Sequence, residues 1–344
     1  MPDRGPVLVG DRSEREHDEL ADLVDRAREA ADDVPVALDL ARTVGSQLPT
    51  PGSGRTGHLW SALASVAAVD LTVARTLEPH LDALAILEQA GRTPEDGTWG
   101  VYAAEGPGEP LRSEPAGDAH VLEGRKHWCS LGGVVDRALV SAWVGEERQL
   151  FAVDLRQPGA TAVPGTWVAR GLTGVDSGPI DFTGATAYAV GEPGWYLERP
   201  GFAWGGIGVA AVWFGGAVGI ARRMLRAAGT RLPDQVALMH LGAVDAALHA
   251  AASVLARAAH DVDAGLLTGA DGWRAALRVR EVVAVAAEDV LTRAAHGLGP
   301  GPLATDEDHA RRVADLGLYL RQWHAERDQV ALGTELLQHG ARGW

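Results

Sequence analysis

The chain has 344 residues, 46% of them hydrophobic and 22% charged, which is typical of a folded protein long enough for two or three domains. Its 31 basic and 46 acidic residues give a formal net charge of −15, which argues against a nucleic-acid surface. The single cysteine, Cys129, excludes an internal disulfide and argues against a thiolate metal cluster. We therefore expect no metal site, no signal peptide and a reducing, cytoplasmic location.

The first part of the chain is predicted to be helical. Apolar residues at helical spacing predict a helix over 14–32, and residues 47–58 are rich in Pro, Gly, Ser and Thr, as in a loop. A second helical block is expected over 59–90, broken near Pro79 and closed by Gly91. These signals predict an N-terminal helical domain over 1–95.

Short runs of β-prone residues follow, separated by turn signals such as residues 115–118. The runs lie at 98–103, 120–122, 137–143, 149–153, 160–163 and 186–190. Many short strands with frequent turns predict a small barrel or sandwich over 96–200. If the run 122–130 is one strand, Trp128 and Ser130 share a face and Cys129 points the other way, as a packed residue.

Helical spacing returns at about residue 202 and continues to the end. The uncharged stretch 201–221 is crowded with glycine, which favours a buried bundle helix over a membrane span. A heptad seam follows a helix start at Pro233 and Asp234; it consists of Leu241, Leu248, Leu255 and Val262. Thr305 with Asp308 predicts a capping box before a helix over 306–331, ended by Gly333. We expect a C-terminal four-helix bundle over 201–344.

The order of helical, β and helical regions, together with several motifs, resembles the acyl-CoA dehydrogenase superfamily. The motifs are residues 69–75 and 78–84, Trp99–Glu105, the Gly-x-Lys-x-Trp-x-Ser run 124–130, residues 194–200 and residues 232–235. The resemblance implies an α+β multidomain fold with an N-terminal helical domain, a central small β-barrel and a C-terminal four-helix bundle. It also implies FAD between barrel and bundle, and a homodimer or homotetramer in which a second subunit completes the site.

The resemblance also assigns residues to the cofactor. These are Val101, Ala103, Ala104, Trp128, Ser130, Arg231 and Gln235. Backbone groups of the first three would contact the flavin edge, Trp128 would pack on the ring, and Ser130 would bond near its reactive nitrogen. A tryptophan of the barrel core is the alternative interpretation of Trp128. Arg231, beside Gln235, stands where the family has its pyrophosphate-gripping Arg-x-x-Phe-Gly segment, which is absent here.

The sequence departs from the family at the catalytic base. Removal of an acidified α-proton needs a carboxylate, which the family places eight residues after the aspartate of an Arg-x-x-x-Asp pattern. Arg311 and Asp315 supply that pattern, but the eighth residue is Trp323. The alternative family position lies within 212–228, which has no carboxylate. His324, suited to a monooxygenase, and Glu326, a displaced base, are the catalytic candidates; both could instead belong to a solvated helix face.

The sequence therefore predicts an FAD-dependent oxidoreductase that oxidises an acyl thioester, as acyl-CoA or a carrier-bound acyl group, or a related specialised metabolite. One alternative is a flavin-dependent monooxygenase on the same fold. The other is a degenerate, non-redox scaffold or binding protein. The expected partners are a small-molecule substrate and further copies of the chain, with no nucleic acid and no membrane.

Overall fold

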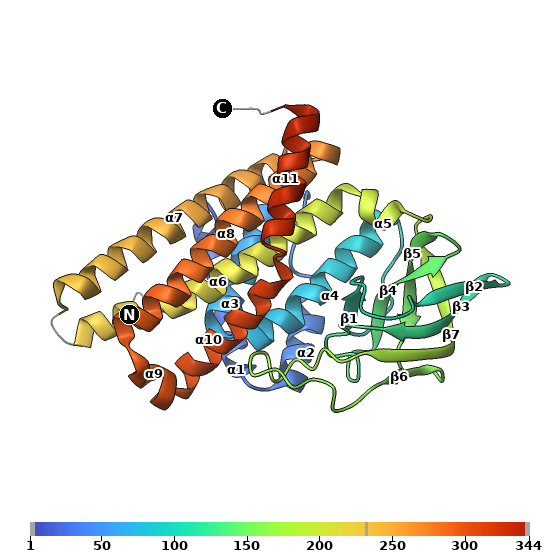
Figure 1. The fold of residues 1–344 in the computed structure, drawn as a ribbon, viewed down its shortest axis with the longest axis horizontal. Helices are drawn as coiled ribbons and strands as arrows, with labels where there is room; N and C mark the ends of the chain where they lie inside the picture. Colours follow the sequence, from blue (N-terminus) through green and yellow to red (C-terminus); the bar gives the residue numbers. More distant parts are fainter. Residues whose placement is uncertain (1–3, 231–232, 341–344) are drawn as a thin grey trace.

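The computed structural model describes residues 4–230 and 233–340 (Figure 1). Long helices fill one end of the molecule and a small barrel of strands fills the other. The helices before the barrel are α1 (Glu14–Glu29), α2 (Val34–Val44), α3 (Thr56–Val69) and α4 (Leu71–Gln89). The strands are β1 (Trp99–Tyr102), β2 (Arg112–Ala116), β3 (Ala119–Lys126), β4 (Arg137–Val144), β5 (Glu147–Asp154), β6 (Ala160–Ala162) and β7 (Ile180–Val190).

The remaining helices form the bundle and its connections. They are α5 (Trp195–Glu198), α6 (Pro200–Thr230), α7 (Gln235–Asp263), α8 (Gly269–Leu298), α9 (Pro300–Thr305), α10 (Glu307–Tyr319) and α11 (Glu326–His339). A one-turn 3₁₀ helix, Leu320–Gln322, follows α10. The helical and β elements thus occur in the predicted order. The domain limits 1–95, 96–200 and 201–344 stay a prediction.

The break in the second helical block lies at Asp70, so the prediction of a break at Pro79 was wrong. Asp70 is extended, at φ −157° and ψ 129°, and its carboxylate caps α4 by accepting a hydrogen bond from the Val73 amide at 2.9 Å. Pro79 lies inside α4, where the surrounding helices bury it. Tertiary packing therefore outweighs the local cost of proline, about 3 kcal/mol.

Five strands close into a barrel in the order β4, β2, β3, β7 and β5, because β5 also pairs antiparallel with β4. The predicted turn at 115–118 was half wrong, since Pro115 and Ala116 belong to β2. Among the described strands β1 pairs with β4 alone, in parallel register from Trp99 opposite Arg137. The outer edge of β1 is therefore open, and α4 anchors its first residue through a hydrogen bond from the Trp99 amide to His80 Nδ1.

The prediction that one strand continues through Ser130 was wrong. β3 ends at Lys126, and Trp128 has a left-handed backbone at φ 62°, which breaks the alternation of side chains. The segment is held by hydrogen bonds from the Cys129 amide to the Gly178 carbonyl and from the Leu131 amide to the Asp176 carbonyl. Trp128 is 55% exposed, so it is not a barrel-core residue, while Cys129 is buried as predicted.

Helix α6 lies at the centre of the bundle, against α3, α7, α8 and α10. By length and composition α6 and α7 could each cross a membrane, but 72% of the apolar window of α6 is buried inside the fold. The heptad seam of α7 faces inward at Leu255 and Val262, and Asp234 caps the helix as expected.

The predicted single helix over 306–331 is two helices. Asp306 caps α10 in place of Thr305, the chain breaks at 323–325, and Gly333 lies within α11. Ala325 has a left-handed backbone at φ 49°, which turns the chain into α11. Local spacing could not reveal this break, because no glycine or proline marks it.

Lys126 lies at the centre of a buried hydrogen-bond network in the barrel. Its side chain is 2% exposed, and its ammonium group donates to the Ser141 carbonyl and hydroxyl, both at 2.9 Å, and to Glu105 at 3.2 Å.

We expect Lys126→Ala to lower the free energy of unfolding by about 3 kcal/mol, because it removes one partner of a buried charge network. Urea unfolding measures this loss. The neighbouring pair Arg125–Asp181 is exposed, so Arg125→Ala should cost less than about 1 kcal/mol; equal losses would contradict this role.

Candidate active site

Helix α4 carries charged side chains into the contact between barrel and bundle. The Arg75 guanidinium donates to the Ser130 hydroxyl at 3.1 Å and to the Glu78 carboxylate at 3.1 Å. On the bundle side, the Tyr319 hydroxyl donates to the same carboxylate at 3.3 Å. We call Arg75, Glu78, Ser130 and Tyr319 the α4 polar cluster; it joins the barrel, α4 and α10 in one hydrogen-bonded chain.

Glu78 is the group in this cluster that can exchange a proton near neutral pH. Its burial raises the pKa of the carboxyl to about 7, and the nearby Arg75 charge and the Tyr319 hydrogen bond offset that rise only in part. Burial likewise raises the pKa of the Tyr319 phenol well above its usual value, so Tyr319 stays a hydrogen-bond donor. A carboxyl whose pKa lies near the working pH is suited to general acid–base chemistry.

The barrel end of the cluster has features that a flavin ring needs. The open edge of β1 offers backbone groups near Val101, the Trp128 indole is an exposed aromatic face, and Ser130 is a hydroxyl only 8% exposed. The Ala103 carbonyl, however, already accepts hydrogen bonds from Arg148 and Ser141, and Ala104 is exposed. The residues present therefore fit a flavin, with Ala103 contributing less than the resemblance implies.

The backbone around Ser130 is strained. Trp128 at φ 62° and Leu131 at φ 56° both lie in the left-handed region, which costs non-glycine residues about 1–3 kcal/mol each. Leu172, on the loop before β7, is left-handed as well at φ 50°, and its amide is held by the buried carboxylate of Asp315. Such strain persists only where surrounding bonds fix the chain, and it collects at functional sites.

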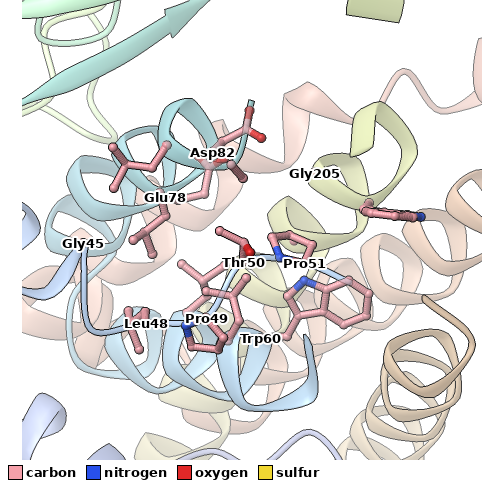
Figure 2. A pocket seen from close by; sticks show the side chains of 16 residues that line it. Gly45, Leu48, Pro49, Thr50, Pro51, Trp60, Glu78, Asp82 and Gly205 are labelled. Atoms are coloured by element: carbon pink, nitrogen blue, oxygen red, sulfur yellow. The ribbon is translucent and has the colours of Figure 1, made fainter. Parts of the chain in front are cut away.

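Two cavities adjoin the cluster, and both are lined by Glu78 and Asp82, one turn apart on α4. The larger, about 250 Å³, lies between α4, α6, α8 and the connection from α10 to α11. Its lining includes Tyr196, Phe202, Trp273, Arg280 and His324. The smaller, about 40 Å³, is mostly apolar; Figure 2 shows Glu78 and Asp82 projecting from α4 on its upper side, with Thr50, Pro51 and Trp60 below.

The structure separates the two catalytic candidates. His324 lies at the rim of the larger cavity, with its side chain 64% exposed and Nδ1 3.3 Å from Asp328. Glu326 is exposed at the start of α11 and is not among the residues that line the cavity. Trp323, at the position of the family's carboxylate, is buried. A catalytic role for Glu326 stays a prediction that its position does not support.

The predicted cofactor residues also fall into two groups. Val101 lies on β1, and Trp128 and Ser130 lie just after the end of β3, whereas Gln235 is exposed at the beginning of α7, at the end of the bundle away from the barrel (Figure 1). Arg231 lies outside the described residues. One copy of the chain therefore does not bring Gln235 to Val101, Trp128 and Ser130.

Sequence reasoning missed Arg75, Glu78 and Asp82. A signal was present: three charged residues, spaced by three and four, occur in a helix whose other inward positions are uncharged at neutral pH or apolar. That spacing places them on one helical face. Because α4 is packed on both sides, this face is buried and its charges must be satisfied within the fold.

Comparisons with known proteins identify the fold. Neither a family model nor a curated protein sequence matches the chain. Among solved structures, a complex of TdsC from Paenibacillus sp. A11-2 with FMN and indole matches with TM-score 0.81 and 17% identity, over 95% of this chain and 98% of that one. TdsC is named a dibenzothiophene monooxygenase.

Two further structures have different activities. Butyryl-CoA dehydrogenase from Megasphaera elsdenii matches with TM-score 0.82 and 16% identity, over 95% of this chain and 99% of that one. A nitrososynthase from Micromonospora carbonacea var. africana matches with TM-score 0.78 and 15% identity, over 98% of this chain and all of that one (100%). At these identities the likeness concerns the fold: the chain has the acyl-CoA dehydrogenase-like fold, with helical regions around a small closed five-stranded barrel.

Proposed function

We propose that the protein is a flavin-dependent monooxygenase acting on a small organic molecule. FAD is the cofactor that the sequence resemblance implies, and the FMN bound by TdsC makes FMN the second candidate. A bound flavin supplies two-electron redox chemistry and, once reduced, reactivity toward oxygen. A cytoplasmic location stays a prediction.

The flavin would be held at the mouth of the barrel. Backbone groups at the open edge of β1 would bond the edge of the ring, and the Trp128 indole would cover one face. The Ser130 hydroxyl, which is bonded to Ser177 Oγ at 2.8 Å, would turn to donate its hydrogen bond to the ring. Arg75, already bonded to Ser130, brings a positive charge to the same wall. That charge favours the electron-rich, reduced state of a ring bound there.

The position of the Glu78 carboxylate is the observation that favours a monooxygenase over a dehydrogenase. Glu78 is joined through one guanidinium to Ser130, so it belongs to the wall that would hold the flavin. A dehydrogenase base must instead approach the substrate from the side away from the flavin, and at the sequence position of the family's carboxylate this chain has the buried indole of Trp323. A proton donor beside the flavin is suited to oxygen chemistry, in which oxygen gains electrons and protons together.

A dehydrogenase is the second candidate, and one observation favours it. Glu78 lines the larger cavity and has a pKa of about 7, which also suits a base that removes a proton from a bound acyl thioester. If the protein were instead a degenerate, non-redox scaffold, we would expect neither flavin binding nor redox activity.

The first prediction concerns flavin binding. Purified protein mixed separately with FAD and FMN should retain one of them as a yellow species through gel filtration. Ser130→Ala should weaken the affinity about three- to tenfold, because one hydrogen bond contributes about 0.5–1.5 kcal/mol. Ser113, a buried barrel serine bonded to His120, provides the control, and Ser113→Ala should leave the flavin affinity unchanged.

Oxygen consumption then separates the two redox functions. A monooxygenase loaded with reduced flavin should consume oxygen and should not bleach with acyl-CoAs in the absence of a reductase. Bleaching by an acyl-CoA alone would favour the dehydrogenase. A protein that retains neither flavin would exclude both functions and leave the non-redox scaffold.

The second prediction follows from the raised pKa of Glu78. In the unfolded chain this carboxyl titrates near 4.5 and in the folded protein near 7, so the folded state binds more protons between these values. Stability should therefore fall as pH rises from 4.5 to 7. Relative to Glu78→Gln, the wild type should lose about 3 kcal/mol across this window, since one pKa unit is about 1.4 kcal/mol.

Urea unfolding of both proteins at several pH values measures this difference. Glu88, exposed on the same helix, supplies the control: Glu88→Gln should differ from the wild type by the same amount at every pH. A wild-type-to-Glu78→Gln difference that does not vary with pH would show that Glu78 is ionised throughout, and would remove it as the proton donor.

The third prediction concerns self-association, which we propose from an exposed apolar face of α7. Only 22% of the apolar window of α7 is buried, and Val236 and Met239 are 57% and 56% exposed. A second copy covering this face would remove it from water. Light scattering should report a dimer or tetramer, and the double variant Val236→Glu, Met239→Glu should shift it toward monomer. The exposed loop variant Val168→Glu should not; a monomeric wild type would contradict the proposal.

A further inference from the structure

The larger cavity contains a carboxylate without a close partner. The Asp82 side chain is 22% exposed, and its nearest cation, Arg199, lies 3.9 Å from it. That distance exceeds the usual hydrogen-bond length of about 2.7–3.2 Å. Within the described part of the chain the Asp82 carboxylate accepts no hydrogen bond. A partly buried carboxylate without a hydrogen-bond donor is costly, so a cationic donor that entered the cavity would be stabilised beside it.

Glycines of α6 make the space around this carboxylate. A Cβ at Gly205 would lie 3.0 Å from the Asp82 oxygen Oδ1, and one at Gly206 would lie 3.7 Å from Arg280. On α6, therefore, two adjacent glycines leave bare backbone opposite α4 and opposite α8, where the larger cavity lies. The glycine-rich composition of 201–221 thus has a local purpose beyond helix packing.

The two arginines that line the same cavity donate hydrogen bonds to acceptors within the protein. Arg199 donates to the Gln89 side chain at 2.8 Å. Arg280 donates to the backbone carbonyls of Gly206 at 3.0 Å and Gln322 at 2.7 Å. These donors are directed to internal acceptors, and Arg199 Nε, which has no acceptor among the described residues, is itself buried. Asp82 keeps its lone pairs, so the cavity is suited to a cation better than to an anion.

Aromatic rings complete the wall. Phe202 and Trp273 are stacked with centroids 6.3 Å apart, and Tyr196 meets Phe202 edge-on at 5.5 Å. Ring faces attract ammonium groups and also cover apolar carbon, so one surface accommodates both halves of an organic amine. The four side chains Asp82, Tyr196, Phe202 and Trp273 come from α4, α5, α6 and α8 and converge on one cavity.

We propose that this cavity binds an organic amine as its ammonium ion, with Asp82 as counter-ion and the aromatic rings around the carbon skeleton. The proposal rests on the proposed function only in that the amine would be the substrate of the monooxygenase. Binding itself needs no flavin and no redox step, so it is measured independently.

Calorimetric titration of the full-length protein tests the site with 2-phenylethylamine and its neutral isostere 2-phenylethanol. We expect the amine to bind the wild type at least tenfold more tightly than the alcohol. Asp82→Asn keeps the shape of the side chain and should weaken amine binding at least tenfold while leaving alcohol binding unchanged. Asp39→Asn, at an exposed carboxylate on α2, should change neither.

Equal affinity for the two probes, or no measurable binding of the amine, overturns the proposal. So does an Asp82→Asn variant that retains the amine affinity of the wild type. If that variant does not fold, the comparison of the two probes on the wild type decides alone. Titrating both the flavin-free and the flavin-loaded protein keeps the outcomes distinct. A protein that binds the amine but retains neither FAD nor FMN refutes only the monooxygenase, whereas an active flavoprotein indifferent to amines refutes only the amine site.

Discussion

The ion pair between Arg75 and Glu78, buried in the middle of the molecule, is the interaction on which the rest of the arrangement depends. A buried charge that loses its partner costs about 3–5 kcal/mol, so each group must be satisfied by something fixed in place. Arg75 finds Ser130 on the barrel, and Glu78 finds Tyr319 on α10. These two contacts join the barrel and the bundle to α4, beside the two cavities that Glu78 lines.

The same constraint determines what the site can do. Because Glu78 is deeply buried, its proton affinity rises into the neutral range; because Arg75 stays beside it, the carboxyl keeps a fixed orientation. Asp82, one turn further along α4, differs from Glu78 because it faces the larger cavity and has no hydrogen-bond donor close to it. One helical face thus carries both the carboxyl that we propose as the proton donor and the carboxylate that we propose as the counter-ion of the ligand.

Much of the fold could be predicted from the sequence, because residue spacing and helix caps are signals that lie within short segments of the chain. The seam of α7 and the cap at Asp234 are readable from spacing alone. The turn at Trp128 and the break at Ala325 are not, because both depend on hydrogen bonds to segments distant in the chain or on packing that overrides propensity. The motif around Ser130 was found, but Glu78 was not, because a glutamate in a helix gains its significance only from what buries it.

Trp323 was the strongest sequence argument against catalysis, since it stands where a carboxylate was expected. The structure changes the weight of that argument, because α4 brings two carboxylates, Glu78 and Asp82, to the larger cavity. Acid–base capacity can therefore be supplied without the family's usual residue. A scaffold with no chemistry would gain stability by replacing Glu78 with an apolar side chain and by relaxing Trp128 and Leu131. The chain instead retains all three costs within one region, which is the pattern expected of a working site.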